Sequence, residues 1–420
     1  MANILIACEL GGNLGHLSKV LLLARSLRAR GHRVAAAVRD PKAAARLFAP
    51  EGLAFVASPL LRSVRSRGPI GSYAGILAGF GYADPERLGH AVAAWKALIS
   101  RTRTDFVVAD HAPTALLGAR AAGVLAVSVG TGFENPPPSI PLPGFFSSID
   151  REALLATEGA VLVGVNSVLA AHSVAALPAL GALFYSTKVV LATLPVLDPY
   201  GPRAGVDYFG PLYMDEGEDA VWPEAGSTRV FVYLKGPAVE TVLRTLTRLK
   251  DLCVLAYLPG FPESAYAQAI GGSELRFRRS DLPVRIGSVL ADADLVISNG
   301  GHGLAAACFE EGVSLAAAPN TMEQRLTAER LEAVGAASVI EGPVSEGRVV
   351  RAVERWRGRR RRAVRMKVAA VAQTADRIAA RIEEDWRLTT DINASDVQSW
   401  SGSAGDLLTF VKSTNSGRAA

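Results

Sequence analysis

The sequence has little cysteine, and what it has is scattered. Its three cysteines, Cys8, Cys253 and Cys308, lie far apart, and each stands among apolar neighbours. This spacing provides neither a disulfide framework nor a cysteine-ligated zinc site, which excludes the small domains that depend on them. We therefore expect a protein of the reducing cytoplasm.

A signal peptide and a long apolar run are also missing. The N-terminal sequence MANILIACEL has no basic lead and no cleavage site, and it predicts a buried strand. The longest uncharged stretch, residues 159–187, is interrupted by Asn166, His172 and Pro178. A membrane span needs about 20 predominantly apolar residues, so we predict none and expect at most peripheral membrane contact.

Charge of one sign is concentrated in only one short run. The formal net charge is +5 and 20% of the residues are charged, but only Arg359 to Arg362 form a basic cluster. Proteins that bind nucleic acid usually present a concentrated basic face, so we expect no nucleic-acid partner. The weak positive charge suits anionic small molecules. The four arginines suit either a solvated helix face or anionic lipid headgroups.

What the sequence does contain is a repeated alternation of short apolar strands and helical segments, typical of parallel sheets built from βαβ units. In the first half we predict strands at 3–8, 33–38, 105–109 and 124–129, with helices over 17–27 and 113–122. The alternation restarts with strands at 229–234, 252–257 and 293–298 and a helix at 239–249. The predicted fold class is doubly wound α/β.

The chain is long enough for two domains, since it has 420 residues of which 49% are hydrophobic. Residues 194–228 are dense in Pro, Gly and acidic side chains, which predicts a linker instead of a packed element. We predict an N-terminal domain over 1–210, a C-terminal domain over 211–365, a helix over 366–388 and a disordered tail over 389–420.

Two glycine-rich loops follow predicted strands. The first, GGNLGHLSK at residues 11–19, suits a phosphate site, a seat for a catalytic histidine or only a tight turn. The second, NGGHGL at residues 299–304, opens a helix whose free N–H groups and dipole form an anion site, unless it too is only a turn. Neither loop matches GxGxxG or GxxxxGK[ST], which disfavours a dinucleotide oxidoreductase despite Asp40 after the second strand. We predict that the second loop binds phosphate.

Four blocks of sequence occur in a fixed order over most of residues 1–340. They are GGNLGHLSKVLLLARSLRARGHRV, FVVADHAPTALLGARAAGVLAVSV, LDPYGPRAGVDYFGPL and the span from LPVRIGSVLADADLVISNGGHG to AAAPNTMEQRLTAERLEAVGA. Together they resemble the UDP-glycosyltransferase-like superfamily of GT-B glycosyltransferases, of the bacterial family 1 type. The resemblance implies two Rossmann-like domains facing across a cleft, with the acceptor on the first, a nucleotide sugar on the second, and a final helix crossing back to the first domain.

The resemblance also implies an inverting transferase in which His16 is the general base and Asp110 orients it. A hydroxyl acceptor is too weak an acid to lose its proton unaided, which fits this role. A helix N-terminus disfavours the imidazolium form, so we expect His16 to stay neutral. A histidine that only caps its loop is the structural alternative, and Asp105 and His111 are alternatives to Asp110.

On the donor side, this chain departs from the family at two positions. Asn299 stands where the family has a histidine, and Ala307 where it has a glutamate that holds the ribose. An asparagine can still donate a hydrogen bond to phosphate, whereas an alanine cannot replace a carboxylate. Glu310 or Glu311 on the next turn is the substitute we consider.

The other donor contacts implied by the resemblance have matching residues. Glu323 and Gln324 suit sugar hydroxyls because they accept and donate together, the backbone at Val284 reads the base, and loop donors stabilise the leaving group. Lys235 suits either the nucleotide phosphates or a surface position. The full predicted set is Lys235, Gly236, Val284, Asn299, Gly300, Gly301, His302, Gly303, Glu323 and Gln324. The expected donor is a UDP- or dTDP-sugar.

No metal or other cofactor is predicted. Asp292 and Asp294 form a DxD pattern, but it precedes its strand, so we interpret both as loop and strand-start acids. For the acceptor, Gly12 and Asn13 would let a ligand approach the backbone closely. Residues 70–83 and 159–187 suit either the lining for an apolar small molecule or lipid, or ordinary helix core.

Two further functions stay open from the sequence. A nucleotide-sugar epimerase of the same architecture would need acid and base groups beside the sugar but no acceptor pocket. A catalytically silent homologue that acts as a partner protein would fit the changes at Asn299 and Ala307.

Overall fold

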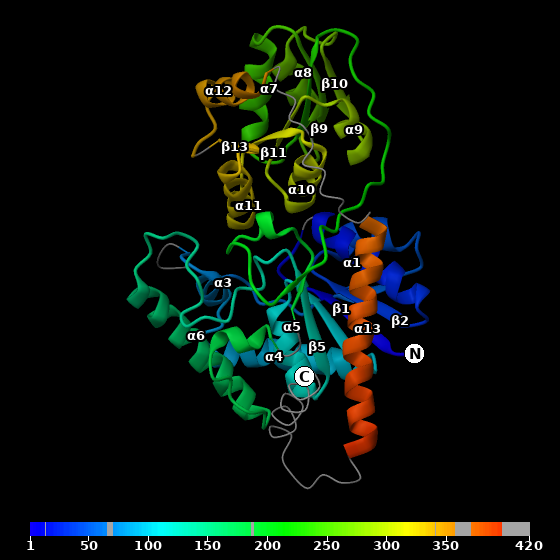
Figure 1. The fold of residues 1–420 in the computed structure, drawn as a ribbon, viewed down its shortest axis with the longest axis vertical. Helices are drawn as coiled ribbons and strands as arrows, with labels where there is room; N and C mark the ends of the chain where they lie inside the picture. Colours follow the sequence, from blue (N-terminus) through cyan, green and yellow to red (C-terminus); the bar gives the residue numbers. More distant parts are fainter. Residues whose placement is uncertain (13, 65–69, 186–188, 341, 358–370, 397–420) are drawn as a thin grey trace.

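The computed structural model describes residues 1–12, 14–64, 70–185, 189–340, 342–357 and 371–396 (Figure 1). The first seven strands are β1 (Asn3–Cys8), β2 (Arg33–Val38), β3 (Ala54–Ala57), β4 (Phe106–Asp110), β5 (Leu125–Gly130), β6 (Val190–Leu191) and β7 (Asp207–Tyr208). Their helices are α1 (Leu14–Ala29), α2 (Pro41–Phe48), α3 (Tyr73–Gly79), α4 (Pro85–Arg101), α5 (Pro113–Ala122) and α6 (Arg151–Ala171).

The second set of strands comprises β8 (Thr228–Tyr233), β9 (Leu252–Tyr257), β10 (Phe277–Ser280), β11 (Leu295–Ser298), β12 (Ser314–Ala317) and β13 (Ala337–Val339). Its helices are α7 (Ala238–Arg248), α8 (Glu263–Ile270), α9 (Ile286–Asp292), α10 (His302–Glu311), α11 (Met322–Ala333) and α12 (Glu346–Trp356), and α13 (Val371–Asp396) follows them. The two sheets belong to two domains, one above the other in Figure 1.

Both sheets are parallel and covered by helices on both faces. In β1, Ile4 and Ile6 belong to the core formed with α1 and α2, whereas Leu5 and Ala7 belong to the core formed with α4 and α5. A strand buried on both faces needs an almost continuous apolar run, and β1 has one. For this reason the apolar segments of the sequence predicted the positions of the strands.

Each sheet has a point where the strand order reverses. The orders are β3-β2-β1-β4-β5-β6-β7 and β10-β9-β8-β11-β12-β13, so the reversals lie between β1 and β4 and between β8 and β11. At such a point the loops leave the strands toward opposite faces and form a crevice at the carboxyl ends. His16 lies in the first turn of α1, which follows β1, and the loops after β4, β8 and β11 carry His111, Lys235 and Asn299. The doubly wound α/β prediction is confirmed.

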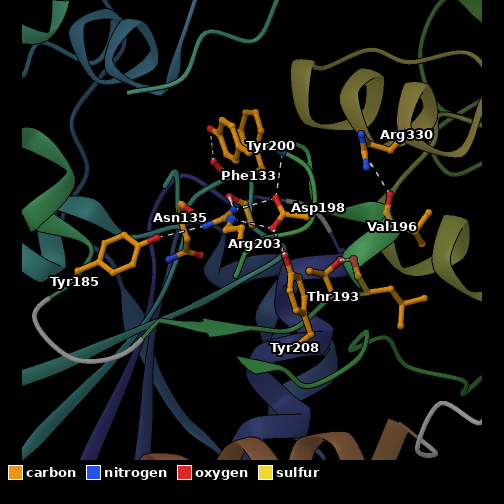
Figure 2. A network of polar contacts seen from close by, with 12 residues as sticks. Phe133, Asn135, Tyr185, Thr193, Val196, Asp198, Tyr200, Arg203, Tyr208 and Arg330 are labelled. Carbon is orange, nitrogen blue, oxygen red and sulfur yellow. Dashed lines mark hydrogen bonds and ion pairs between the residues drawn. The ribbon is translucent and has the colours of Figure 1, made fainter. Parts of the chain in front are cut away.

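The prediction that residues 194–228 are an unpacked linker is wrong. Leu197 is fully buried, and Asp198 is buried as well. Figure 2 shows Asp198 bonded to Arg203, with Nε–Oδ2 at 2.8 Å, and to the Tyr208 hydroxyl, also at 2.8 Å. Arg203 further donates to the carbonyl oxygen of Asn135 at 2.6 Å. Pro and Gly set the turns of this segment, and a buried ion pair with apolar side chains holds its first part against the first domain. Residues 215–219 are exposed, and there the N–H of Glu218 donates to the carbonyl oxygen of Pro283 in the second domain at 3.0 Å.

The same segment joins the two domains. Just before it, the Thr193 hydroxyl lies 2.7 Å from Nε2 of His302 at the start of α10. The carbonyl oxygen of Val196 accepts a hydrogen bond from Nε of Arg330 on α11, at 3.3 Å (Figure 2). Because the segment contacts both domains, it fixes the second domain's site loop relative to the first.

The last described helix, α13, packs on the first domain beside α1 (Figure 1). Ala375, Ile378, Ala379 and Ile382 are buried in the core that includes α1. The helix continues to Asp396, into the segment predicted as a tail. Residues 389–396 contain neither Pro nor Gly, and extending an existing helix costs far less than starting one. Arg359 to Arg362 and residues 397–420 lie outside the described residues.

Within the described residues, α6 is the one helix long and apolar enough by composition to cross a membrane, with a mean hydropathy of 1.7 over its best window. A single such helix is weak evidence for a span. It packs against α3 and α4, and its buried Glu158 accepts the N–H of Leu142 at 2.5 Å. In this fold α6 is therefore packed on the helices of the first domain.

Candidate functional site

The two crevices share one cavity of about 290 Å³. The first domain lines it with residues of the α1 start and the loop after β5. The second domain lines it with the ends of β8 and β9 and the starts of α10 and α11. Among the lining residues are Gly15, His16, Lys19, Thr131, Tyr233, Lys235, Tyr257, Val284, Asn299, Gly301, His302, Gly303, Glu323 and Gln324.

His16 and Asp110 meet at the first reversal point. His16 lies in the first turn of α1, and Asp110 ends the neighbouring strand β4. Nδ1 of His16 is 2.9 Å from Oδ2 of Asp110, and both side chains are buried. Since a carboxylate accepts, Nδ1 carries the proton and Nε2 is free to take one.

A glycine next to this pair has a steric role. A Cβ built on Gly11 would lie 2.3 Å from Cγ of His16, so only glycine lets the loop close over the imidazole ring. The sequence predicted that an acceptor approaches the backbone of this loop closely at Gly12 and Asn13. Gly11 instead admits the His16 side chain, while Gly12 is exposed and lies beside Arg39. Asn13 lies outside the described residues.

The predicted alternatives to Asp110 do not bind His16. Asp105 accepts the N–H of Asn3 at 2.7 Å, at the opposite end of the strands. His111 has a φ of 49° and packs its ring 5.8 Å from that of His16. Burial lowers the pKa of His111 to about 4. His111 is therefore a neutral neighbour and not the partner of the base.

Lys19 and Glu134 join this pair, and the sequence analysis missed both. Nζ of Lys19 is 2.7 Å from Oδ1 of Asp110 and 3.5 Å from Oε1 of Glu134. Thr131 donates to Oε2 of Glu134 at 2.8 Å, and its hydroxyl is 3.4 Å from Oε1 of Glu323 across the cleft. Lys19 follows His16 by one helical turn, a spacing that places both on one face. This spacing could have identified Lys19 from the sequence. Glu134 could not be identified in this way, because only the tertiary fold brings it to the site.

The charges of this cluster set its protonation. Burial alone would lower the pKa of His16, but the Asp110 carboxylate raises it above 6.5 overall. The expectation that the helix N-terminus keeps His16 neutral is thus wrong in direction, because a carboxylate at 2.9 Å outweighs a helix dipole. Burial would raise the pKa of Asp110, yet Lys19 and His16 hold it well below its usual range.

In the second domain, the Asn299 side chain has a structural role, because it hydrogen-bonds to the backbone of neighbouring loops. Its Oδ1 accepts the N–H of Lys235 at 2.9 Å. Its Nδ2 donates to the carbonyl oxygens of Ala318, at 2.9 Å, and of Lys235, at 3.3 Å. The amide therefore joins the loops after β8, β11 and β12. The expected hydrogen bond from this side chain to phosphate is wrong, because both of its N–H groups already have backbone partners.

The anion-binding features are the start of α10 and Lys235. The first turn of α10 has no acidic residue and no side-chain cap, so its N–H groups are available. Burial lowers the pKa of the half-buried Lys235, and among the described residues no carboxylate pairs with its ammonium group. Burial also lowers the pKa of His302 to about 4, so this histidine brings no positive charge.

The predicted loop glycines divide into two groups. Gly301 and Gly303 line the cavity, and a Cβ on Gly301 would meet nothing within 4 Å. Gly300 has a φ of +79°, which favours glycine, and Gly236 lies beside Asn320 away from the lining. Gly300 and Gly236 thus shape the loops without facing the cavity.

Glu323 and Gln324 both line the cavity at the start of α11. Burial and the neighbouring carboxylates raise the pKa of Glu323, although His16 opposes this. Oε1 of Gln324 accepts the N–H groups of Asn320 and Thr321, which caps the helix. Its carbonyl oxygen therefore serves the helix, and only its NH₂ group is left for a ligand.

The ribose contact has no predicted replacement at the cavity. Ala307 is 1% exposed in the core beneath α10, so a carboxylate there would be buried. Glu310 and Glu311 do not line the cavity, and burial raises the pKa of Glu310 to about 7. Glu216, which the sequence analysis did not identify, does line it and is 2.6 Å from Arg25.

The residues that might hold a metal do not fit one. Asp292 is 3.0 Å from Arg229, and Asp294 accepts the Arg229 N–H at 2.8 Å, at the amino ends of the strands. Within the described residues, Cys8, His16 and Asp110 offer ligand atoms within 4.8 Å of one another. The Lys19 ammonium already binds Asp110, and burial raises the pKa of the Cys8 thiol, both of which oppose a dication.

The described residues of the two segments considered for an acceptor, 70–83 and 159–185, do not line the cavity. Tyr73 and Tyr82 are fully buried, and α3 packs against α6. The buried residues of both segments belong to the apolar core of the first domain. Ordinary helix core describes them better than a ligand lining.

Comparison with solved structures gives matches over nearly the whole chain. The glycosyltransferase of kitacinnamycin is 19% identical, with a TM-score of 0.60, over 93% of this chain and 98% of that chain. The spinosyn rhamnosyltransferase SpnG is 16% identical, with a TM-score of 0.59, over 94% and 100%. The glycosyltransferase VinC, solved with dTDP, is 17% identical, with a TM-score of 0.57, over 92% and 95%.

No protein-family model matches the chain, and no curated protein matches it in sequence. At the identities of the structural matches, the likeness establishes the fold. The chain has the GT-B fold, with two Rossmann-like domains facing across a cleft. The predicted resemblance is confirmed at that level.

Proposed function

We propose that this protein is an inverting, metal-independent glycosyltransferase that moves a sugar from a nucleoside diphosphate sugar to a hydroxyl or similar acceptor. The observation that carries the proposal is the contact of 2.9 Å between His16 and Asp110, which opens onto the cavity lined by the start of α10 and Lys235. A general base and an anion site thus face the same space. The acceptor is a small molecule or a lipid.

The base chemistry follows from the free Nε2 of His16. This atom takes the proton of the acceptor hydroxyl as the oxygen attacks the anomeric carbon. The imidazolium that forms is stabilised by Asp110, which stays ionised throughout. A single displacement of this kind inverts the configuration at the anomeric carbon.

The leaving diphosphate is served from the second domain. Its developing charge is stabilised by the N–H groups of the first turn of α10 and by the Lys235 ammonium. Lys235 offsets the histidine that Asn299 replaces. Glu323 accepts from sugar hydroxyls, and the NH₂ group of Gln324 donates to them.

The donor we favour is a dTDP- or UDP-sugar, since VinC, a structural neighbour, was solved with dTDP. The described cysteines are all free, which fits a cytoplasmic enzyme. A silent partner protein is the competing candidate, because Asn299 and Ala307 remove two expected donor contacts.

The test is a screen of nucleotide sugars for nucleoside diphosphate release, with and without a pool of acceptors. We expect release that depends on acceptor and is lost in His16→Ala. The matched control is His90→Ala, because His90 is exposed on α4. Isomerisation of the sugar without acceptor indicates an epimerase, and donor binding without turnover indicates the silent homologue. Full transferase activity in His16→Ala contradicts the assignment of the base.

A further inference from the structure

Lys19 is a buried cation beside the base. Its side chain is 7% exposed, and it lies on α1 one turn after His16. Its ammonium lies between two carboxylates, Asp110 at 2.7 Å and Glu134 at 3.5 Å. Burying a charged group is costly unless it is paired, so this arrangement is built around the pairs.

We propose that Lys19 is a positioning residue for the base: its ammonium holds Asp110 by Oδ1, which leaves only Oδ2 to face His16, and it neutralises Glu134. This inference rests on the proposed function of His16. Lys19 itself touches neither the acceptor nor the sugar in this account.

The contacts of Asp110 limit the rotation of its carboxylate. An ionised carboxylate offers two oxygens and about four lone pairs, so an unheld Asp110 has several ways to meet a histidine. Lys19 occupies one oxygen at 2.7 Å, and Nδ1 of His16 meets the other at 2.9 Å. Gly11 packs closely against the imidazole ring. Together these contacts fix the direction in which Nε2 points.

Several titratable groups surround His16. The groups are Cys8 on β1, Lys19 on α1, Asp110 and His111 at the end of β4, Glu134 after β5 and Glu323 on α11. Carboxylates outnumber cations among them, and Lys19 is the cation that opposes them. The carboxylates raise the pKa of His16, and Lys19 lowers it. Without Lys19 the base would be more fully protonated near neutral pH, and so unable to take a proton.

The test compares Lys19→Met with the unmodified full chain. The pKa of His16 is measured from its ring resonances in an NMR titration without substrate, assigned by their loss in His16→Gln. We expect the pKa to rise by about one unit or more, the usual size for removing an adjacent charge. The acid limb of kcat/KM for transfer is expected to move upward by the same amount. Lys42→Met, on the exposed face of α2, is the control and is expected to change neither.

A second pair of variants guards against misfolding. Lys19→Met leaves the buried Glu134 carboxylate without its cation, which can destabilise the fold. The double variant Lys19→Met/Glu134→Gln removes both charges and so keeps the net charge of the unmodified cluster. It is compared with the single variant Glu134→Gln. The double variant is expected to have the higher pKa at His16, and Lys19→Arg to stay near the parent value. An unchanged pKa at His16 in both comparisons, with activity lost, assigns Lys19 a structural role and overturns the inference.

The two proposals fail separately. If no donor and acceptor support transfer but the NMR pKa of His16 still rises in Lys19→Met, the proposed function fails and the effect of Lys19 stands. If transfer occurs and the acid limb does not move, the proposed function stands and the inference about Lys19 is overturned.

Discussion

The two halves of the cavity are built from opposite kinds of polar group. The half from the first domain contains ionisable side chains, and each lies within 3.5 Å of another ionisable group: His16, Lys19, Asp110 and Glu134. The half from the second domain offers mainly backbone N–H groups, the amide of Gln324 and the neutral His302. Its ionisable groups are the Glu323 carboxyl and Lys235, whose ammonium group has no carboxylate partner among the described residues.

This difference separates proton transfer from anion binding. A base needs fixed charges around it, because they set its protonation and direction. A diphosphate needs hydrogen-bond donors that have no other partner. Each sheet has a reversal point of the same kind, and the two points support different chemistry because different side chains follow their strands. Changes in one half are expected to affect one kind of step.

The largest effect is expected from Asp110→Asn. Lys19 would hold the amide oxygen, so the NH₂ group would face Nδ1 of His16 and force the proton onto Nε2. The base would then be blocked, and kcat is expected to fall about 10³-fold or more. Donor affinity, measured by calorimetry with dTDP or UDP, is expected to stay unchanged. An equal loss of donor affinity would contradict the separation of the two halves.

A smaller effect is expected where the halves are joined. Arg203→Met leaves the buried Asp198 without its charged partner, which typically costs about 3–5 kcal/mol. The free energy of unfolding in urea is expected to fall by that amount. Arg46→Met, on the exposed face of α2, is the control and is expected to change it by less than about 0.5 kcal/mol. An equal change in both variants would mean that the segment is an unpacked linker after all.

Lys235→Met is expected to act on the donor half alone. Hydrogen bonds to charged groups are worth about 1.5–3 kcal/mol, so the Kd for dTDP or UDP is expected to rise about tenfold or more. The pH at which activity falls is expected to stay the same. Lys250→Met, an exposed lysine of the second domain, is the control. Unchanged affinity in Lys235→Met would leave the start of α10 as the sole anion site.

The smallest effect is the pH profile of the unmodified protein. The base must be neutral, and Asp110 raises the pKa of His16, so kcat/KM is expected to fall as the pH decreases through a value above 6.5. His111 and His302, with a pKa of about 4, are neutral above pH 5 and add no limb there. A limb near pH 4 alone would show that another group is the base.

The strands and the base were accessible from the sequence for physical reasons. Buried parallel strands need apolar runs, and the predicted strands at 3–8, 33–38 and 252–257 coincide with β1, β2 and β9. His16 and Asp110 follow neighbouring strands, so the resemblance placed them on adjacent elements of the sheet. Lys19 was recognisable only as one more helix residue, because its role depends on Asp110 and Glu134 arriving from elsewhere.

Composition misled the analysis where packing decides. Pro, Gly and acidic residues indicate turns, but they do not show whether the turns pack, and in residues 194–228 the Asp198–Arg203 pair is buried. The role of Asn299 was predicted from the phosphate contact that the resemblance implies at this position. Its amide instead matches three backbone groups, which a sequence does not display.

The central claim is that His16 is the base and the second domain holds the donor. The most direct measurement is the single-turnover rate of nucleoside diphosphate release, at saturating donor and acceptor, in the unmodified protein and in His16→Ala. The account predicts equal donor binding and a rate about 10²–10⁴-fold lower in the variant. Equal rates in the two proteins would contradict it.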